Sequence, residues 1–98
     1  MRLVKNINVI LRSIHGSFFL IDISDNYSGD RCSLYETNEI GKFLWECLDE
    51  KKSVEDLVEA LQRAIIDEIP YDVLYNDVTE YIVDLKNKGF VMEMDENG

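Results

Sequence analysis

The sequence has little of the residue types that most often mark a catalytic or metal site. Its 98 residues include one proline, one histidine and two cysteines. Two cysteines are too few for the disulfide framework of a small secreted protein, which favours a cytoplasmic location. A zinc site needs three or four clustered ligands, whereas Cys32 and Cys47 are fifteen residues apart and no CxxC pair occurs. We therefore expect neither a metal ion nor a cofactor.

Long apolar runs and basic residues are also scarce. No stretch approaches the roughly 20 apolar residues of a membrane-spanning helix, and no signal peptide is evident. Lys and Arg number 10 against 20 Asp and Glu, so the formal net charge is −10. Such a charge opposes binding to phosphate backbones and anionic lipids. Neither nucleic acid nor a membrane is therefore an expected partner.

What the sequence does contain is enough apolar material for one folded domain. Hydrophobic residues make up 46% of the chain and charged residues 31%, a balance typical of a globular protein. No repeat, low-complexity tract or linker divides the sequence. Residues 1–98 are therefore expected to form a single domain.

The first third of the chain has the pattern of β-strands. Residues 3–12 and 17–23 are rich in Val, Ile, Leu and Phe, and His15-Gly16 between them is a turn signal, so a hairpin is expected. The second arm is almost continuously apolar, which predicts a strand covered on both faces. After a stretch of turn residues, a third strand is expected from about 31 to 36.

From Asn38 onward the apolar residues recur at helical spacing, and three helices are expected. The first follows Asn38 as its N-cap and runs to about Leu48, and the second opens with Ser53 and Asp56 in a capping-box-like arrangement and ends near Ile66. The third follows Pro70, with Asp72 as its cap, and ends in the signature Lys86–Gly89; residues 90–94 complete the chain as a short terminal strand.

Strands gathered before helices predict an α+β fold, in which the helices pack on one face of an antiparallel sheet. The expected order is βββααα with a short terminal strand. A three-stranded antiparallel sheet followed by three helices is a winged-helix-like layout. The charge is unevenly placed, because residues 1–35 carry +1 and residues 36–98 carry −11.

No constellation of catalytic residues is evident. His15 lies in the expected turn, and Cys47 lies on the apolar stripe of a helix, where it is expected to pack as a small hydrophobe. With 20 carboxylates, chance pairs of acids carry little information. No motif of a nucleotide-binding loop, zinc protease or EF-hand occurs. We therefore expect a protein that is not an enzyme.

An exposed sheet edge offers a different function, because a peptide can add to it as an extra strand. The third expected strand is the candidate edge. A groove between it and the third helix would be lined by Leu34, Val78, Tyr81 and Ile82. These residues fit an ordinary core as well, although the Tyr81 hydroxyl favours a polar rim.

The segment Asn38–Asp49, NEIGKFLWECLD, resembles the signature of the PqqD family, roughly Asn-Glu-x-Gly-x-x-x-Trp-x-x-Leu-Asp. Residues 53–61 and 78–91 resemble the continuation of that family, so the resemblance covers nearly all of residues 15 to 92. The chain departs from the family pattern at Glu50, usually Gly, and at Thr37, usually apolar. Trp45 is expected to be mainly a packing residue, with contact to a partner as the alternative.

The resemblance implies a RiPP recognition element, a non-catalytic peptide chaperone. Such a domain binds the leader of a ribosomally synthesised precursor peptide and presents the peptide to a modifying enzyme, often a radical SAM protein, in PQQ or other natural product biosynthesis. In that family the leader adds beside the third strand and packs on the third helix. The peptide-binding residues carried over are Cys32, Ser33, Leu34, Tyr35, Leu74, Val78, Tyr81 and Ile82.

Two other functions stay open. A winged-helix DNA-binding regulator needs a basic stripe, whereas the third helix carries Asp72, Asp77, Glu80 and Asp84. A dimerisation or scaffold domain is the other alternative, because an unpaired strand edge can pair with a second copy and give a homodimer. For a leader-binding domain, the last three of these acids predict Lys or Arg on the leader.

Overall fold

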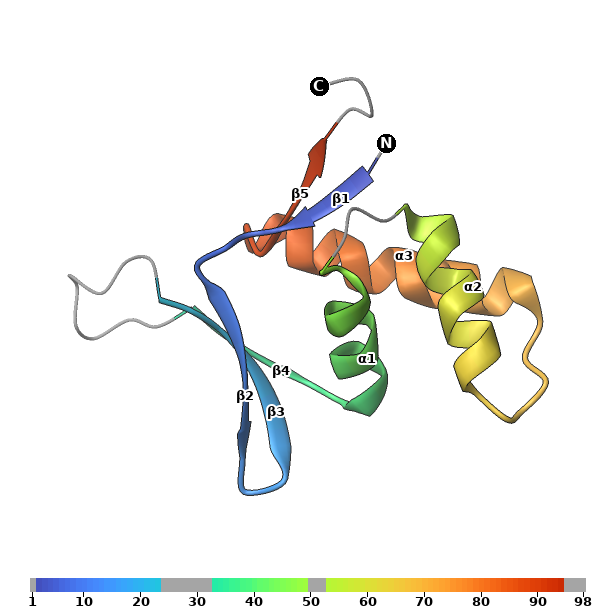
Figure 1. Cartoon of the computed structure of the whole chain (residues 1–98), viewed down its shortest axis with the longest axis horizontal. Coiled ribbons are helices and arrows are strands. Elements are labelled where there is room, and N and C mark those ends of the chain that lie inside the picture. Colours follow the sequence, from blue (N-terminus) through green and yellow to red (C-terminus); the bar gives the residue numbers. More distant parts are fainter. Residues whose placement is uncertain (1, 24–32, 50–52, 95–98) are drawn as a thin grey trace.

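The computed structural model describes residues 2–23, 33–49 and 53–94. The first four elements are the strands β1 (Arg2–Lys5), β2 (Val9–Ile14), β3 (Ser17–Asp22) and β4 (Ser33–Thr37). The helices α1 (Glu39–Cys47), α2 (Val54–Ala64) and α3 (Tyr71–Asn87) follow, and β5 (Val91–Met94) comes last. Figure 1 shows their arrangement. The α+β class with three consecutive helices is confirmed, but four strands rather than three precede the helices.

The strands lie in two antiparallel sheets rather than one. β1 pairs with β5, and the second sheet has the order β2-β3-β4. The first and last strands therefore lie side by side, while the hairpin of β2 and β3 extends away from the helices (Figure 1). β4 leads directly into α1, so the edge of the sheet is joined to the helical part of the fold.

The expected strand 3–12 is interrupted at Asn6, which is why one predicted strand becomes two. The Asn6 side-chain oxygen accepts a hydrogen bond from the Asn8 N–H at 2.9 Å, and the Asn6 carbonyl accepts one from the Val9 N–H at 3.0 Å. Asn6 also donates its own N–H to the Phe90 carbonyl at 2.9 Å. These bonds turn the chain, so that β1 departs to meet β5.

The predicted hairpin is present and closes through His15 and Gly16. Both residues have positive φ, 51° and 83°, as a type I′ turn requires. Glycine adopts this conformation without strain, so its place in the turn has a local cause. The turn aligns Ile14 with Ser17 and sets the register of the whole hairpin. His15 is exposed, as expected for a turn residue.

The first two helices begin at the predicted caps. Asn38 accepts a hydrogen bond from the Gly41 N–H at 2.8 Å. Ser53 and Asp56 form a reciprocal capping box, in which each side chain accepts the other residue's backbone N–H at 3.1 Å. α2 ends at Ala64, two residues before the predicted end near Ile66.

The predicted cap of the third helix is wrong. α3 begins at Tyr71, Pro70 occupies the cap position, and no side chain caps the helix. Asp72 lies within the first turn instead. Pro70 has φ −55° and ψ 142°, an extended conformation that lets the chain enter the helix at the very next residue. An acid in the first turn still interacts favourably with the helix dipole.

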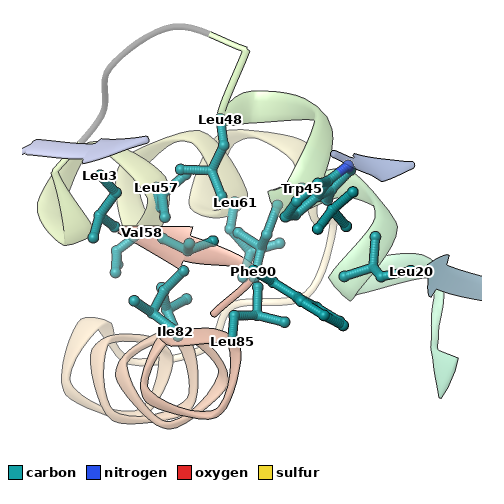
Figure 2. Packing of buried hydrophobic residues seen from close by; sticks show 14 of the residues in the cluster. Leu3, Leu20, Trp45, Leu48, Leu57, Val58, Leu61, Ile82, Leu85 and Phe90 are labelled. Atoms are coloured by element: carbon teal, nitrogen blue, oxygen red, sulfur yellow. The ribbon is translucent and has the colours of Figure 1, made fainter. Parts of the chain in front are cut away.

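The core lies between the helices and the sheets (Figure 2). Leu20 from β3 and Phe90 before β5 are wholly buried there. Trp45 is 3% exposed and its ring lies 4.8 Å from Lys5 Nζ, so its predicted packing role is confirmed. Cys47 is half-buried and packs against the core. No helix in the described part of the chain is long and apolar enough to cross a lipid bilayer.

The β2-β3-β4 sheet contacts the core with one face. Leu11, Leu20 and Tyr35 are partners across the three strands, and all three belong to the core or pack against it. The residues that alternate with them, such as Ile21 and Leu34, point to the other face and are absent from that cluster. The prediction that both faces of β3 are covered therefore does not hold within residues 2–23, 33–49 and 53–94.

Because only one face of the sheet contacts the core, replacing two leucines on adjacent strands should lower the free energy of unfolding by different amounts. Leu20→Ala should lower the free energy of unfolding by about 2–5 kcal/mol, because a fully buried side chain leaves a cavity. Leu34 is 53% exposed, so Leu34→Ala should change the free energy of unfolding by only about 0.5 kcal/mol. Urea unfolding of dilute protein, followed by circular dichroism, measures both. Equal losses would contradict the sidedness of the sheet.

Candidate functional site

In the described part of the chain, β4 is an edge strand of the three-stranded sheet. It pairs with β3 in the register from Phe18–Thr37 to Asp22–Ser33. Within the described ranges, no strand pairs with its other side. The backbone N–H and C=O groups along that side are therefore available to an added strand.

The side chains of β4 alternate between the two faces of the sheet. Tyr35 and Thr37 face the helices, while Leu34 points to the opposite face. The Tyr35 ring lies 6.1 Å from the Tyr81 ring of α3 and is tilted by 60° to it. Lys88 Nζ lies 5.4 Å from the centroid of the Tyr35 ring. An aromatic contact thus joins the edge strand to α3.

The Tyr81 hydroxyl connects β4, α1 and α3. It lies 3.1 Å from Thr37 Oγ1 and donates a hydrogen bond to the Gly41 carbonyl at 3.2 Å. Because its proton is used in that bond, we infer that Thr37 is the donor in the other. Burial raises the pKa of Tyr81 to about 12, while the Thr37 hydrogen bond acts to lower it. The phenol is therefore protonated at neutral pH.

Gly41 is a point of close approach between these elements. A Cβ atom at this position would overlap Thr37 Oγ1 and lie 2.9 Å from the Tyr81 hydroxyl oxygen. Glycine is required here because of the close approach and not because of an unusual backbone angle. We call Thr37, Asn38, Gly41 and Tyr81 the Tyr81 junction.

Two hollows flank the Tyr81 junction, and we call them together the β4–α3 cleft. The first, of about 370 Å³, is lined by Tyr35, Glu36, Thr37, Asn38 and Tyr81. The second, of about 270 Å³, lies between α1, α2 and α3 and shares Asn38 and Tyr81 with the first. Its other lining residues are Ile40, Gly41, Leu44, Leu61, Ile69, Leu74, Asp77 and Val78.

The cleft combines an apolar lining with one acid of α3, and a second acid of α3 lies near the cleft residue Tyr35. Asp77 lines the second hollow. Asp84 lies two turns further along the helix. Burial of the Tyr35 phenol is the larger cause that raises its pKa, and the negative charge of Asp84 is the second cause. Residues 77, 81 and 84 are three or four positions apart, so they share one side of the helix. A guest with apolar and basic side chains would match these walls.

The structure brings together half of the eight predicted site residues. The four that line the cleft are Tyr35, Leu74, Val78 and Tyr81. The Leu34 side chain lies on the other face of the sheet, and Ile82 is 3% exposed within the core and lines neither hollow. Ser33 begins β4, and Cys32 lies outside the described residues.

The expected binding residues include none from Asn38–Asp49, so the sequence analysis missed the part of this segment in the cleft. Asn38, Ile40 and Gly41 line the second hollow. Thr37 was also missed, although strict alternation from Tyr35 would have placed it on the same face. The signal for Gly41 was a glycine inside a helix, which often marks a close approach.

A family model covers the part of the chain that forms the cleft. The family model of coenzyme PQQ synthesis protein D (PqqD) matches residues 27–91. The chain belongs to the PqqD family. Two residues of the PqqD signature, Asn38 and Gly41, belong to the Tyr81 junction, so the signature coincides with the contact between β4, α1 and α3. Thr37, a departure from the usual PqqD pattern, contributes its hydroxyl to the same contact.

Two solved structures share the fold of this PqqD-family chain, whereas no curated protein matches it significantly in sequence. One is TbiB1 in complex with the TbiA(beta) leader peptide, with 17% identity and a TM-score of 0.70 over 95% of this chain and 99% of that chain. The other is lasso peptide synthetase B1 complexed with the leader peptide, with 15% identity and a TM-score of 0.69 over 93% and 98%.

The close approach at Gly41 predicts a coupled pair of substitutions. Gly41→Ala should lower the free energy of unfolding by about 1–3 kcal/mol, because the added methyl overlaps the Thr37 hydroxyl. Removing that hydroxyl in Gly41→Ala/Thr37→Ala should recover part of the loss. Urea unfolding of the wild type, both single variants and the double variant gives the interaction energy. Strictly additive losses would contradict the contact.

Proposed function

We propose that the chain is a non-catalytic, leader-binding domain of residues 1–98. It binds the leader of a ribosomally synthesised precursor peptide and presents the peptide, in the cytoplasm, to a modifying enzyme such as a radical SAM maturase. The product is pyrroloquinoline quinone or another modified peptide. The observation that carries the proposal is the open β4 edge beside an apolar cleft. Both solved structures of similar fold hold a leader peptide.

In the proposed complex, backbone groups and side chains contribute to peptide binding in different ways. The free edge of β4 offers hydrogen bonds that do not depend on the sequence of the peptide. The two hollows offer side-chain selection, because alternate residues of an added strand point to the same face. The second hollow, about 270 Å³ in volume, has room for a large apolar side chain.

The proposed binding residues act in different ways. Ser33 and Leu34 contribute their backbone to the β4 edge, and Cys32 is proposed from the family resemblance alone. Tyr35 and Tyr81 offer aromatic faces, and Leu74 and Val78 form the floor of the second hollow. Ile82, in the core, supports the helix one residue beyond Tyr81.

The charge of α3 favours a peptide over DNA. In a winged-helix-like arrangement the third helix is the one that would enter the major groove, where basic or amide side chains are needed. α3 instead carries Asp72, Asp77, Glu80 and Asp84, all exposed. These carboxylates repel phosphate and attract Lys or Arg, so we propose that the leader is basic where it passes α3.

Strand addition can be tested with the synthetic leader of the precursor peptide encoded beside this protein's gene. Titration into isotope-labelled protein should shift the NMR signals of residues 33–37 and 74–81, with a Kd in the micromolar range because ordering the peptide consumes part of the interaction energy. N-methylation at alternate leader residues should abolish binding, since every second N–H of an edge strand pairs with its neighbour.

The N-methylated peptides also supply the control. Methylation at the intervening residues, whose N–H groups point away from β4, should leave the Kd nearly unchanged. Loss of binding at every position, or at none, would count against strand addition. Shifts confined to residues 9–14 would place the peptide on the opposite edge of the sheet, at β2.

The proposed basic leader predicts different effects for two acids on α3. Asp77 lines the cleft, so Asp77→Asn should weaken leader binding by up to about five-fold at low salt and make it less salt-dependent. Asp72 lies in the first turn outside the cleft, and Asp72→Asn changes the net charge equally. Isothermal titration at two salt concentrations measures both variants. Equal losses would show that only the overall charge matters.

A further inference from the structure

The sheet face that points away from the helices carries an apolar patch that no described element covers. The register places Ile10, Ile21 and Leu34 in one row across β2, β3 and β4. In the described part of the chain, none of these belongs to the core or packs against it. Leu34 is 53% exposed. We call this surface the outer patch, and its residues are Ile10, Ile14, Phe19, Ile21, Ile23 and Leu34.

The outer patch is larger than a single exposed side chain and needs a physical account. Ile14 and Ile23, at its two ends, are 46% and 51% exposed. Contiguous apolar surfaces are often sites of association with another protein. None of the six residues of the outer patch lines the β4–α3 cleft. Glu36, beside the patch, lies at the border, because it also lines the first hollow.

Two opposite charges stand symmetrically about the centre of the patch. The register places Arg12, Phe19 and Glu36 in one row, with Arg12 on β2 and Glu36 on β4. Strands are about 4.8 Å apart, so the charges lie at nearly equal distances on either side of Phe19. No ion pair between described residues involves either of them. Both side chains are exposed.

This arrangement is complementary to itself. When two outer patches are laid face to face about a two-fold axis parallel to β3, β2 of one copy lies over β4 of the other. Arg12 of each copy then faces Glu36 of the other copy, Phe19 faces Phe19, and Ile10 faces Leu34. Apolar groups meet apolar groups and both charge pairs are attractive. We propose that the outer patch is the interface of a homodimer of this chain.

The size of the patch indicates a weak dimer. Three strands about 4.8 Å apart and six residues of about 3.3 Å give a face of roughly 300 Å² per copy, below the roughly 800 Å² of a standard interface. Association should therefore depend on concentration. Because the β4 edge lies in the plane of the sheet, the dimer leaves it open, and this proposal does not rest on leader binding.

Sedimentation velocity of the full chain over a range of concentrations tests the interface. Arg12→Glu alone and Glu36→Arg alone each turn two attractive pairs into repulsive ones, so each should weaken self-association about ten-fold. The double variant Arg12→Glu/Glu36→Arg should associate as the wild type does. An equimolar mixture of the two single variants should also associate like the wild type, because each supplies the charges that the other needs.

The mixture separates the proposed geometry from a folding defect, since two misfolded proteins would not rescue each other. Arg63→Glu and Glu80→Arg, at exposed helical positions outside the patch, change the net charge equally and should leave association unchanged. A wild type that stays monomeric at every concentration would overturn the proposal and assign the patch to another protein. Association that persists in both single variants would also overturn it, and would point to pairing of strand edges.

Discussion

The arrangement of the site depends on one close approach, that of the α1 backbone at Gly41 to Thr37 and Tyr81. The absence of a Cβ atom lets the Tyr81 hydroxyl reach the Gly41 carbonyl and the Thr37 hydroxyl together. This contact holds α3 against the end of β4, yet it uses side chains on one face of the strand and leaves the edge unpaired among the described residues. The Tyr81 contact therefore holds β4 in place without covering its edge among the described residues.

The β2-β3-β4 sheet offers three directions for interaction, and each uses different groups. The inner face binds the core through side chains such as Leu20, and the outer face presents apolar side chains with Arg12 and Glu36 between them. The β4 edge offers backbone hydrogen bonds in the plane of the sheet. A strand alternates its side chains between two faces and directs its hydrogen bonds sideways, so these surfaces use different groups, with Glu36 at the border between the outer face and the cleft.

Two of the differences between expectation and structure arise from contacts with residues distant in the sequence. Asn6 divides the expected strand 3–12 because its turn is completed by Phe90, near the other end of the chain. Leu34 points away from the cleft because the register with Ile21 places it on the outer face, although its apolar character suited either face. At α3 the cause was local instead, since Pro70 itself takes the cap position that Asp72 was expected to fill.

The sequence by itself determined the features that depend on neighbours a few residues away: the helical periodicities, the caps at Asn38 and Ser53, the His15-Gly16 turn and the acidic charge of the helical half. The tertiary structure alone decided that β1 pairs with β5, which face of β4 meets α3, and that Gly41 lies under Tyr81. These contacts join residues 40 or more positions apart in the chain. Local propensity carries no information about them, because they are selected by which packing of the whole chain buries the apolar surface best.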